Sequence, residues 1–151
     1  PYTAHGTQMN YATSLARHDW VLCVDSDEIL DDEVVAAILA LKAGHEPDPA
    51  CAWRLPRYWF VLGEEVRTIY PVSSPDFPVR LFNRSVARFN DRPVDDQVVG
   101  FTHSARLPGF VRHDTFYSLH EVFSKLNSYT TRLVKHQKIR PSLARGAISA
   151  I

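Results

Sequence analysis

The apolar positions of this chain fall into blocks that predict helices alternating with strands. Residues 6–18 carry apolar side chains at helical spacing, and residues 20–24 are an unbroken apolar run, typical of a strand buried on both faces. A second helix is expected from Asp31 to Gly44, because acidic residues can cap its start and a glycine can end it. Its apolar stripe consists of Val34, Val35, Ile38, Leu39 and Leu41.

The middle of the chain is rich in aromatic and β-branched residues, which indicates several strands. We expect strands at residues 52–62, 66–70, 79–84, 86–89 and 110–113. The clearest helix comes last, over residues 115–137, because its apolar residues recur at helical spacing. That stripe consists of Leu119, Val122, Phe123, Leu126, Tyr129, Thr130 and Leu133. This order of elements is typical of the α/β class.

Carboxylates crowd the end of the first predicted strand, at Asp25, Asp27, Glu28 and Asp31. In a strict strand, Asp25 and Asp27 would point the same way, and adjacent carboxylates repel unless a proton or a cation lies between them. Mg²⁺ or Mn²⁺ is the usual partner for oxygen ligands, and open α/β sheets bind ligands at the carboxyl ends of their strands. The density of acids favours a metal site over the alternative, a polar turn that only caps the next helix.

Charge is balanced over the whole chain but not along it. The 151 residues carry no net charge, so the molecule as a whole has no electrostatic attraction to nucleic acid. Residues 19–33 hold seven acids and no base, whereas every charged residue after Glu121 is basic. This split suggests a cation site in one place and an anion-binding face in another. The basic run is a solvated face or meets an anionic membrane surface; it comprises Arg132, Lys135, Lys138, Arg140 and Arg145.

The two cysteines and the lengths of the apolar runs indicate in which cellular compartment the protein is expected. Cys23 and Cys51 lack the spacing of a metal site, so we expect small core residues in a reducing compartment, with a disulfide as the alternative. No apolar run approaches the ~20 residues of a membrane span, and no signal peptide is visible. We therefore expect a cytoplasmic protein, and the basic run allows a peripheral position on the inner face of the cytoplasmic membrane. The chain begins at Pro1 without an initiator methionine, so we expect a piece of a longer protein.

Three segments occur in the order DWVLCVDSDEIL (19–30), RLFNR (80–84) and RHDTFYSLHEVFSKLNSYT (112–130). Together they resemble the family 2 glycosyltransferases of GT-A fold, most closely the bacterial lipopolysaccharide-core and cell-surface glucosyltransferases. The resemblance covers nearly the whole chain, without the family's first β-α-β, which cradles the nucleotide base. It implies one partial domain over 1–151, with a Rossmann-like mixed sheet flanked by helices. Its metal and donor site would lie at 20–32, and its acceptor-side region at 52–113.

The resemblance also implies a reaction, the metal-dependent, inverting transfer of a sugar from a nucleotide donor, for example UDP-glucose, to a glycan or lipid-linked acceptor. Mn²⁺ or Mg²⁺ bridging the diphosphate would stabilise the leaving group. By the family pattern, Asp27 ligates the metal and Asp25 reaches the ribose or a metal-bound water. His113 has the placement of a late metal or diphosphate contact, with a structural role as the alternative. Lys125 and Tyr129 would lie near the wall of the active site, with a core position as the alternative for Tyr129.

An inverting transferase also needs a base for the proton of the acceptor hydroxyl. Asp95 and Asp96 are the candidates, and since adjacent strand residues face opposite ways we favour Asp96. The relatives tend to have a His-Glu pair near this place, so the two aspartates depart from the pattern, and turn acids are the alternative. Of Arg80 and Arg84, one is expected to bind phosphate, because arginine suits bidentate phosphate contacts.

Two other functions fit parts of the sequence. Phosphohydrolases of the haloacid dehalogenase type also place Asp-x-Asp after an apolar strand, but they continue with Gly-Thr or a similar pair. Glu28 and Ile29 stand there instead, and a later Gly-Asp-x-x-x-Asp is absent. The third possibility is a non-catalytic fragment that binds only a metal or a partner.

Overall fold

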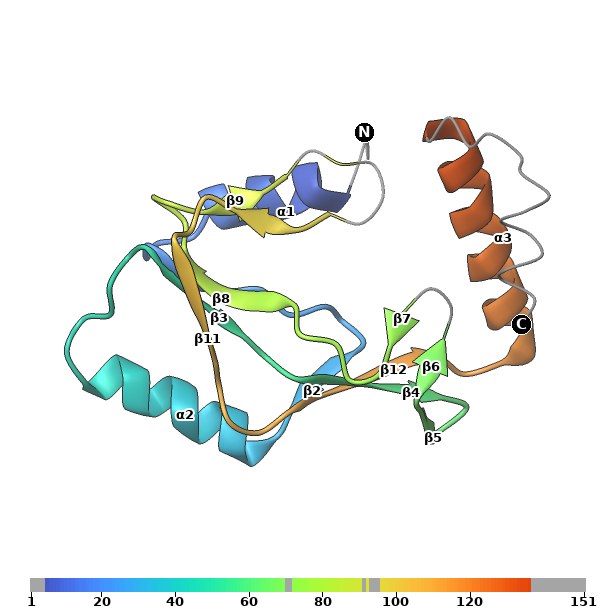
Figure 1. The fold of residues 1–151 in the computed structure, drawn as a ribbon, viewed down its shortest axis with the longest axis horizontal. Coiled ribbons are helices and arrows are strands. Elements are labelled where there is room, and N and C mark those ends of the chain that lie inside the picture. Colours follow the sequence, from blue (N-terminus) through green and yellow to red (C-terminus); the bar gives the residue numbers. More distant parts are fainter. Residues whose placement is uncertain (1–4, 70–71, 91, 93–95, 137–151) are drawn as a thin grey trace.

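A computed structural model describes residues 5–69, 72–90, 92 and 96–136. The described helices are α1 (His5–Ser14), α2 (Asp32–Ala43) and α3 (Leu119–His136) (Figure 1). The first six strands are β1 (Trp20–Leu22), β2 (Glu28–Leu30), β3 (Cys51–Arg54), β4 (Arg57–Val61), β5 (Glu64–Val66) and β6 (Thr68–Ile69). The others are β7 (Val72–Ser73), β8 (Val79–Asn83), β9 (Arg88–Phe89), β10 (Val98–Val99), β11 (His103–Arg106) and β12 (Val111–Phe116).

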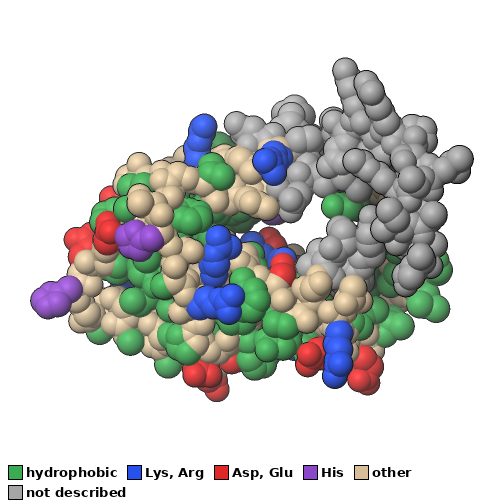
Figure 2. Space-filling model, viewed as in Figure 1, with side chains coloured by type: hydrophobic (Ala, Val, Ile, Leu, Met, Phe, Trp, Pro, Cys, Tyr) green, Lys and Arg blue, Asp and Glu red, His purple; other side chains and the backbone are tan. Residues whose placement is uncertain are grey.

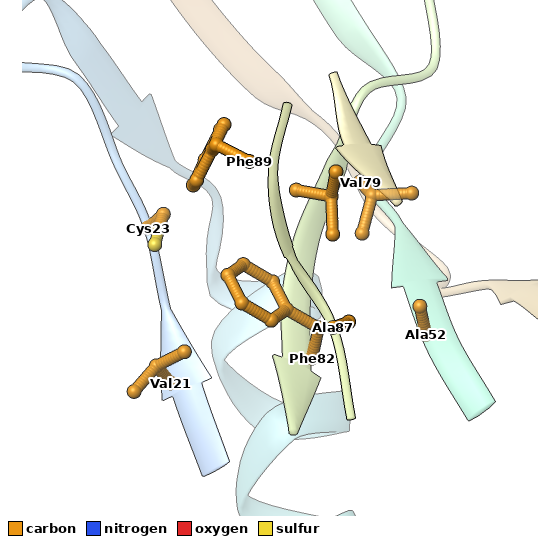
Figure 3. Close-up of a cluster of buried hydrophobic side chains, with 8 residues drawn as sticks. Val21, Cys23, Ala52, Val79, Phe82, Ala87 and Phe89 are labelled. Atoms are coloured by element: carbon orange, nitrogen blue, oxygen red, sulfur yellow. The ribbon is translucent and has the colours of Figure 1, made fainter. Parts of the chain in front are cut away.

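The first four-stranded sheet has the order β1-β8-β3-β11 and mixes antiparallel with parallel pairs. Figure 1 shows α2 on one side of this sheet and α1, with β9, on the other. On the α1 side, buried side chains of β1, β3 and β8 pack with those of the β9–β10 hairpin, and Phe82 meets Phe89 edge to face (Figure 3). On the α2 side, a second cluster surrounds Trp53 and Val34. The predicted α/β class and mixed sheet are confirmed.

Three connections carry the chain from the first sheet to a second sheet of order β2-β12-β4-β5. They run from β1 to β2 through residues 23–27, from β3 to β4 through residues 55–56, and from β11 to β12 through residues 107–110. Since β2 and β4 both pair with β12, the three connections arrive on neighbouring strands. The acidic cluster therefore lies at the junction of the two sheets.

The first strand is less buried than its composition predicts. Val21 and Cys23 are buried, but Leu22 is 38% exposed and Val24 37% exposed. Val21 and Cys23 pack on the α1-side cluster, whereas in the alternate row Trp20 packs on the α2-side cluster and Leu22 and Val24 do not. The prediction of a strand buried on both faces was wrong.

The second helix has the predicted ends. The Asp31 carboxylate accepts a hydrogen bond from the backbone N–H of Val34 at 2.8 Å, and the N–H of Gly44 donates to the carbonyl of Ala40. The stripe is narrower than predicted, because Val35 and Leu39 are exposed. The helix instead packs on the core through Val34, Ala37, Ile38 and Leu41.

The predicted strand at 52–62 is two strands, because the chain leaves the first sheet at Leu55 and Pro56 and enters the second as β4. The predicted return strand at 86–89 is β9, which pairs with β10 rather than with β8. The strand expected at 66–70 falls on two strands, because Val66 ends β5, which pairs with β4, and Thr68–Ile69 is β6, which pairs with β7. Residue 70 lies outside the described residues. Neither β10 nor β11 was predicted: β10 has only two residues, and β11 pairs with a strand about fifty residues away in sequence.

Helix α3 begins four residues later than predicted, because Thr115 and Phe116 still belong to β12. The structure describes it as far as His136, so residue 137 is outside the described part. Figure 1 shows α3 beyond the end of β12, set apart from α1 and α2. Its apolar stripe is only partly covered, since Leu119 is 63% exposed and Phe123 68% exposed. None of the described helices is both long and apolar enough to cross a membrane.

Both cysteines are free thiols buried in the core, so the core expectation is confirmed and the disulfide alternative was wrong. Burial raises the pKa of the Cys23 thiol to about 11, and the carboxylate of Asp25 adds to this while Arg80 opposes it. Cys23 is therefore protonated at neutral pH and acts as a small apolar residue.

Gly109 offers a test of how β12 is joined to α2. Its φ is +80°, and a Cβ there would lie 2.5 Å from Oδ1 of Asp31 and 2.6 Å from the N of Val34. We expect Gly109→Ala to lower the free energy of unfolding by about 3 kcal/mol, through backbone strain plus overpacking of the α2 cap. Gly63→Ala is the matched control: φ is +85° with nothing within 4 Å, so a loss of about 1 kcal/mol is expected. Urea denaturation measures both, and equal losses would contradict the packing argument.

Candidate active site

The acidic cluster forms a tight turn rather than a continuation of β1. The N–H of Glu28 donates to the carbonyl of Asp25 at 3.1 Å, and the N–H of Asp25 donates to the Glu28 carboxylate at 3.1 Å. The side chain of Glu28 is fully buried. Because the chain turns at Ser26 and Asp27, strand alternation does not set the directions of the carboxylates. Asp25 and Asp27 therefore meet different partners.

Two arginines neutralise the buried side of this turn. Arg80, from β8, donates to Oδ2 of Asp25 at 2.7 Å and to Oε1 of Glu28. Arg57, from β4, donates to the same Glu28 oxygen at 2.9 Å, and makes two further bonds of 2.9 and 2.5 Å to Asp76. A buried carboxylate is tolerated only when paired in this way. The network fixes the turn against both sheets.

The network also sets the charge of Asp25. Burial alone would raise the pKa of this carboxyl, but the ion pair and hydrogen bond with Arg80 outweigh burial and lower the pKa below its usual value. Asp25 is consequently ionised at neutral pH, with one oxygen held by Arg80.

Asp27 faces a histidine of the second sheet. Its Oδ2 lies 3.3 Å from Nε2 of His113, whose β12 position pairs with Glu28 on one side and Trp59 on the other. The His113 ring packs edge-on against Trp59 at 4.3 Å and is 8% exposed, whereas Asp27 is 31% exposed. Burial lowers the pKa of His113 and Arg57 lowers it further, against the opposing effect of Asp27. The ring is therefore neutral at pH 7, the form in which histidine binds metals.

A cavity of about 400 Å³ lies beside the turn. Its charged lining combines three arginines with three aspartates: Arg54, Arg57, Arg80, Asp25, Asp76 and Asp96. In Figure 2 the molecule is hollowed on this side, and acidic and basic side chains lie at the edge of the hollow. Such a lining suits a polar ligand that carries both hydroxyl groups and negative charge.

Asp96 lines this cavity, and so does His5, a residue that the sequence analysis did not single out. Asp96 is 19% exposed, and one of its oxygens lies 3.0 Å from Nδ1 of His5. Nε2 of the same ring lies 3.8 Å from Oδ1 of Asp25. No local pattern marks His5, because its partners are distant in sequence and α1 brings it to them. Asp95 lies outside the described residues.

The other predicted residues lie elsewhere. Arg84 donates to the carbonyl of His18 at 3.0 Å and lies 3.4 Å from Asp19, so it fastens the end of the α1 segment to β8. Lys125 donates to the carbonyl of Thr115 at 3.1 Å. Neither Arg84 nor Lys125 lines the cavity, whereas Arg80 does.

Within the described residues, no group of three or more His, Cys, Asp or Glu side chains could hold a metal ion. Asp27 and His113 are fewer than three, but Mg²⁺ sites often use only one or two carboxylates and take their other ligands from substrate phosphates and water. Ligands at right angles on a cation with bonds of about 2.1 Å are about 3 Å apart. The 3.3 Å between Oδ2 and Nε2 fits two such neighbouring ligands.

We compared the sequence with family models and with curated proteins to find what it is similar to. No family model matches the chain. Its relatives include an uncharacterized glycosyltransferase of Rickettsia typhi and an uncharacterized glycosyltransferase of Rickettsia prowazekii. Each is 26% identical over an alignment of 145 residues that covers 89% of this chain and 49% of the relative. The chain thus spans about half the length of the curated relatives that it matches.

Proposed function

We propose that this chain carries the catalytic site of a glycosyltransferase of family 2 type and GT-A fold. The reaction is the inverting transfer of a sugar from a nucleotide donor, for example UDP-glucose, to a glycan or lipid-linked acceptor. The observation that carries the proposal is the turn that sets Asp27 against His113 and Asp25 against Arg80, beside a cavity that also receives Asp96. The two relatives that are named glycosyltransferases support the same class of reaction.

The described residues suggest which groups hold the donor. Asp27 and neutral His113 would hold Mn²⁺ or Mg²⁺, and this ion would supply positive charge to the departing diphosphate. Asp25 is ionised and held on one side by Arg80, so its other oxygen is a fixed acceptor for a hydroxyl group of the donor. Arg80 is 6% exposed and already bonds two carboxylates, so we infer that it acts on the donor through Asp25.

We also propose that α3 contacts the membrane in which a lipid-linked acceptor would lie. A lipid-linked acceptor would lie at a bilayer surface, and α3 exposes apolar side chains near basic ones, with Arg132 and Lys135 both exposed. Such a helix suits the boundary between lipid headgroups and acyl chains, where basic residues meet anionic lipid. The rest of the basic run, Lys138, Arg140 and Arg145, lies outside the described residues.

Replacing Asp27 tests the proposed metal pair. With Asp27→Asn in the full-length protein, we expect release of UDP from UDP-sugars in the presence of Mn²⁺ to fall on the order of 100-fold, because the amide is a poor ligand for a hard cation. Asp32→Asn, at the exposed start of α2, is the matched control and should keep the wild-type rate. Product UDP is measured by a coupled assay at several Mn²⁺ concentrations.

Two results of that assay would count against the proposal. One is an Asp27→Asn protein as active as the wild type, and the other is release of UDP at the same rate after removal of divalent cations. Hydrolysis of a generic aryl phosphate is measured alongside, because rapid hydrolysis would favour a phosphohydrolase.

Vesicle binding tests the membrane contact. We expect the protein to sediment with vesicles of anionic phospholipid more than with phosphatidylcholine alone, and less at high salt, since each Lys or Arg near the surface contributes about 1 kcal/mol. Phe123→Ser should weaken this binding severalfold. Tyr11→Ser is the matched control, because Tyr11 on α1 is as exposed as Phe123, at 68%. Equal loss in both variants, or no preference for anionic vesicles, would exclude α3 as the contact.

A further inference from the structure

The ring of His5 spans two carboxylates at the mouth of the cavity. Nδ1 lies 3.0 Å from Oδ2 of Asp96, and Nε2 lies 3.8 Å from Oδ1 of Asp25. The second distance is too long for a hydrogen bond. The His5 side chain is 43% exposed, whereas that of Asp96 is 19% exposed. Nδ1 is therefore held by a carboxylate, whereas Nε2 makes no hydrogen bond to the described residues, and the side chain that carries it lines the cavity.

This arrangement is built by the packing of α1 on β9. The side-chain amide of Asn10 donates to the carbonyl of Phe89 and accepts from its N–H, each at 2.9 Å. Gly6 lets the helix approach the hairpin closely, because a Cβ at this position would collide with the carbonyl oxygen of Asn90 and touch Asp96. The backbone bond from the N–H of Asn90 to the carbonyl of Gln97, 2.8 Å long, holds the hairpin that carries Asp96. His5 is consequently fixed in position before a substrate arrives.

We propose that His5, oriented by Asp96, is the group that accepts the proton of the acceptor hydroxyl. The inference rests on the proposed glycosyl transfer and replaces Asp96 as the direct base. As the acceptor oxygen bonds to the anomeric carbon, the bond from that carbon to the diphosphate breaks, and the diphosphate leaves with the electron pair. The hydroxyl proton moves to Nε2 of His5, which becomes an imidazolium and later releases the proton to water.

Three features favour Nε2 over the Asp96 carboxylate. Asp96 already bonds Nδ1, and its remaining exposure is less than half that of His5. A carboxylate that holds one ring nitrogen while the other faces the substrate is the arrangement that orients histidine bases in hydrolases on unrelated folds. The ring gains positive charge in the step, and it does so between Asp96 and Asp25, whose carboxylates stabilise that charge.

The test is His5→Asn in the full-length protein. An asparagine amide can replace Nδ1 as the donor to Asp96 but offers nothing in place of Nε2. We expect the rate of sugar transfer to the acceptor to fall on the order of 100-fold or more, as for loss of a general base. Binding of UDP with Mn²⁺, measured by calorimetry, should stay as in the wild type. His45→Asn, in the exposed loop after α2, is the matched control and should transfer at the wild-type rate.

A second variant separates chemistry from folding. His5→Ala opens space beside Asp96, and added imidazole should restore part of its transfer rate, which it would not do for a residue that only supports the fold. Wild-type transfer by His5→Asn, with transfer abolished in Asp96→Asn, would make Asp96 the base and overturn the inference. Absence of rescue in a folded His5→Ala would also overturn it. If the wild type releases no UDP from any UDP-sugar with Mn²⁺, the proposed function fails and the role of His5 falls with it.

Discussion

The buried carboxylate of Glu28 is the constraint on which the rest of the site depends. It accepts hydrogen bonds from Arg80, Arg57 and the backbone of Asp25, and so joins β8, β4 and the acidic turn at one point. Leaving a buried charge without one of its partners costs about 3–5 kcal/mol, so these elements hold one another in place. The same contacts fix the direction of Asp25, and the β2–β12 pairing that starts at Glu28 brings His113 to Asp27.

Local patterns in the sequence predict those parts of the fold that local forces decide. The ends of α2 were predicted because Asp31 and Gly44 act on their own neighbours in sequence. The split of the 52–62 segment was not, because whether the chain stays in one sheet or passes to another depends on which distant strands accept it. The prediction that β1 is buried on both faces failed for a related reason. An apolar run shows that a strand can be buried on both faces, but which elements cover each face is decided by distant parts of the chain.

In the candidate site, too, local sequence patterns indicated some residues, whereas others depend on contacts between distant segments. Asp25 and Asp27 stand out because carboxylates directly after an apolar strand are conspicuous, and Arg80 because it belongs to a segment with family resemblance. The sequence could not show that the chain turns between the two aspartates, which sends one to Arg80 and the other to His113. His5 was missed altogether, since nothing around it differs from an ordinary helix start. Its position follows from Asn10 and Gly6, which fit α1 to a hairpin about eighty residues away in sequence.

The clamp between Asn10 and Phe89 has an evolutionary consequence. It anchors the hairpin to α1, whereas the acidic turn is anchored by Arg57 and Arg80 at the junction of the two sheets. Because these two anchors share no residue, a substitution in the hairpin can change its side chains without loosening the ion pairs of the acidic turn. Diversification among descendants of such a protein should accordingly concentrate at exposed hairpin positions such as Arg88 and Val99, with Asp96 and the ion-paired junction inherited unchanged.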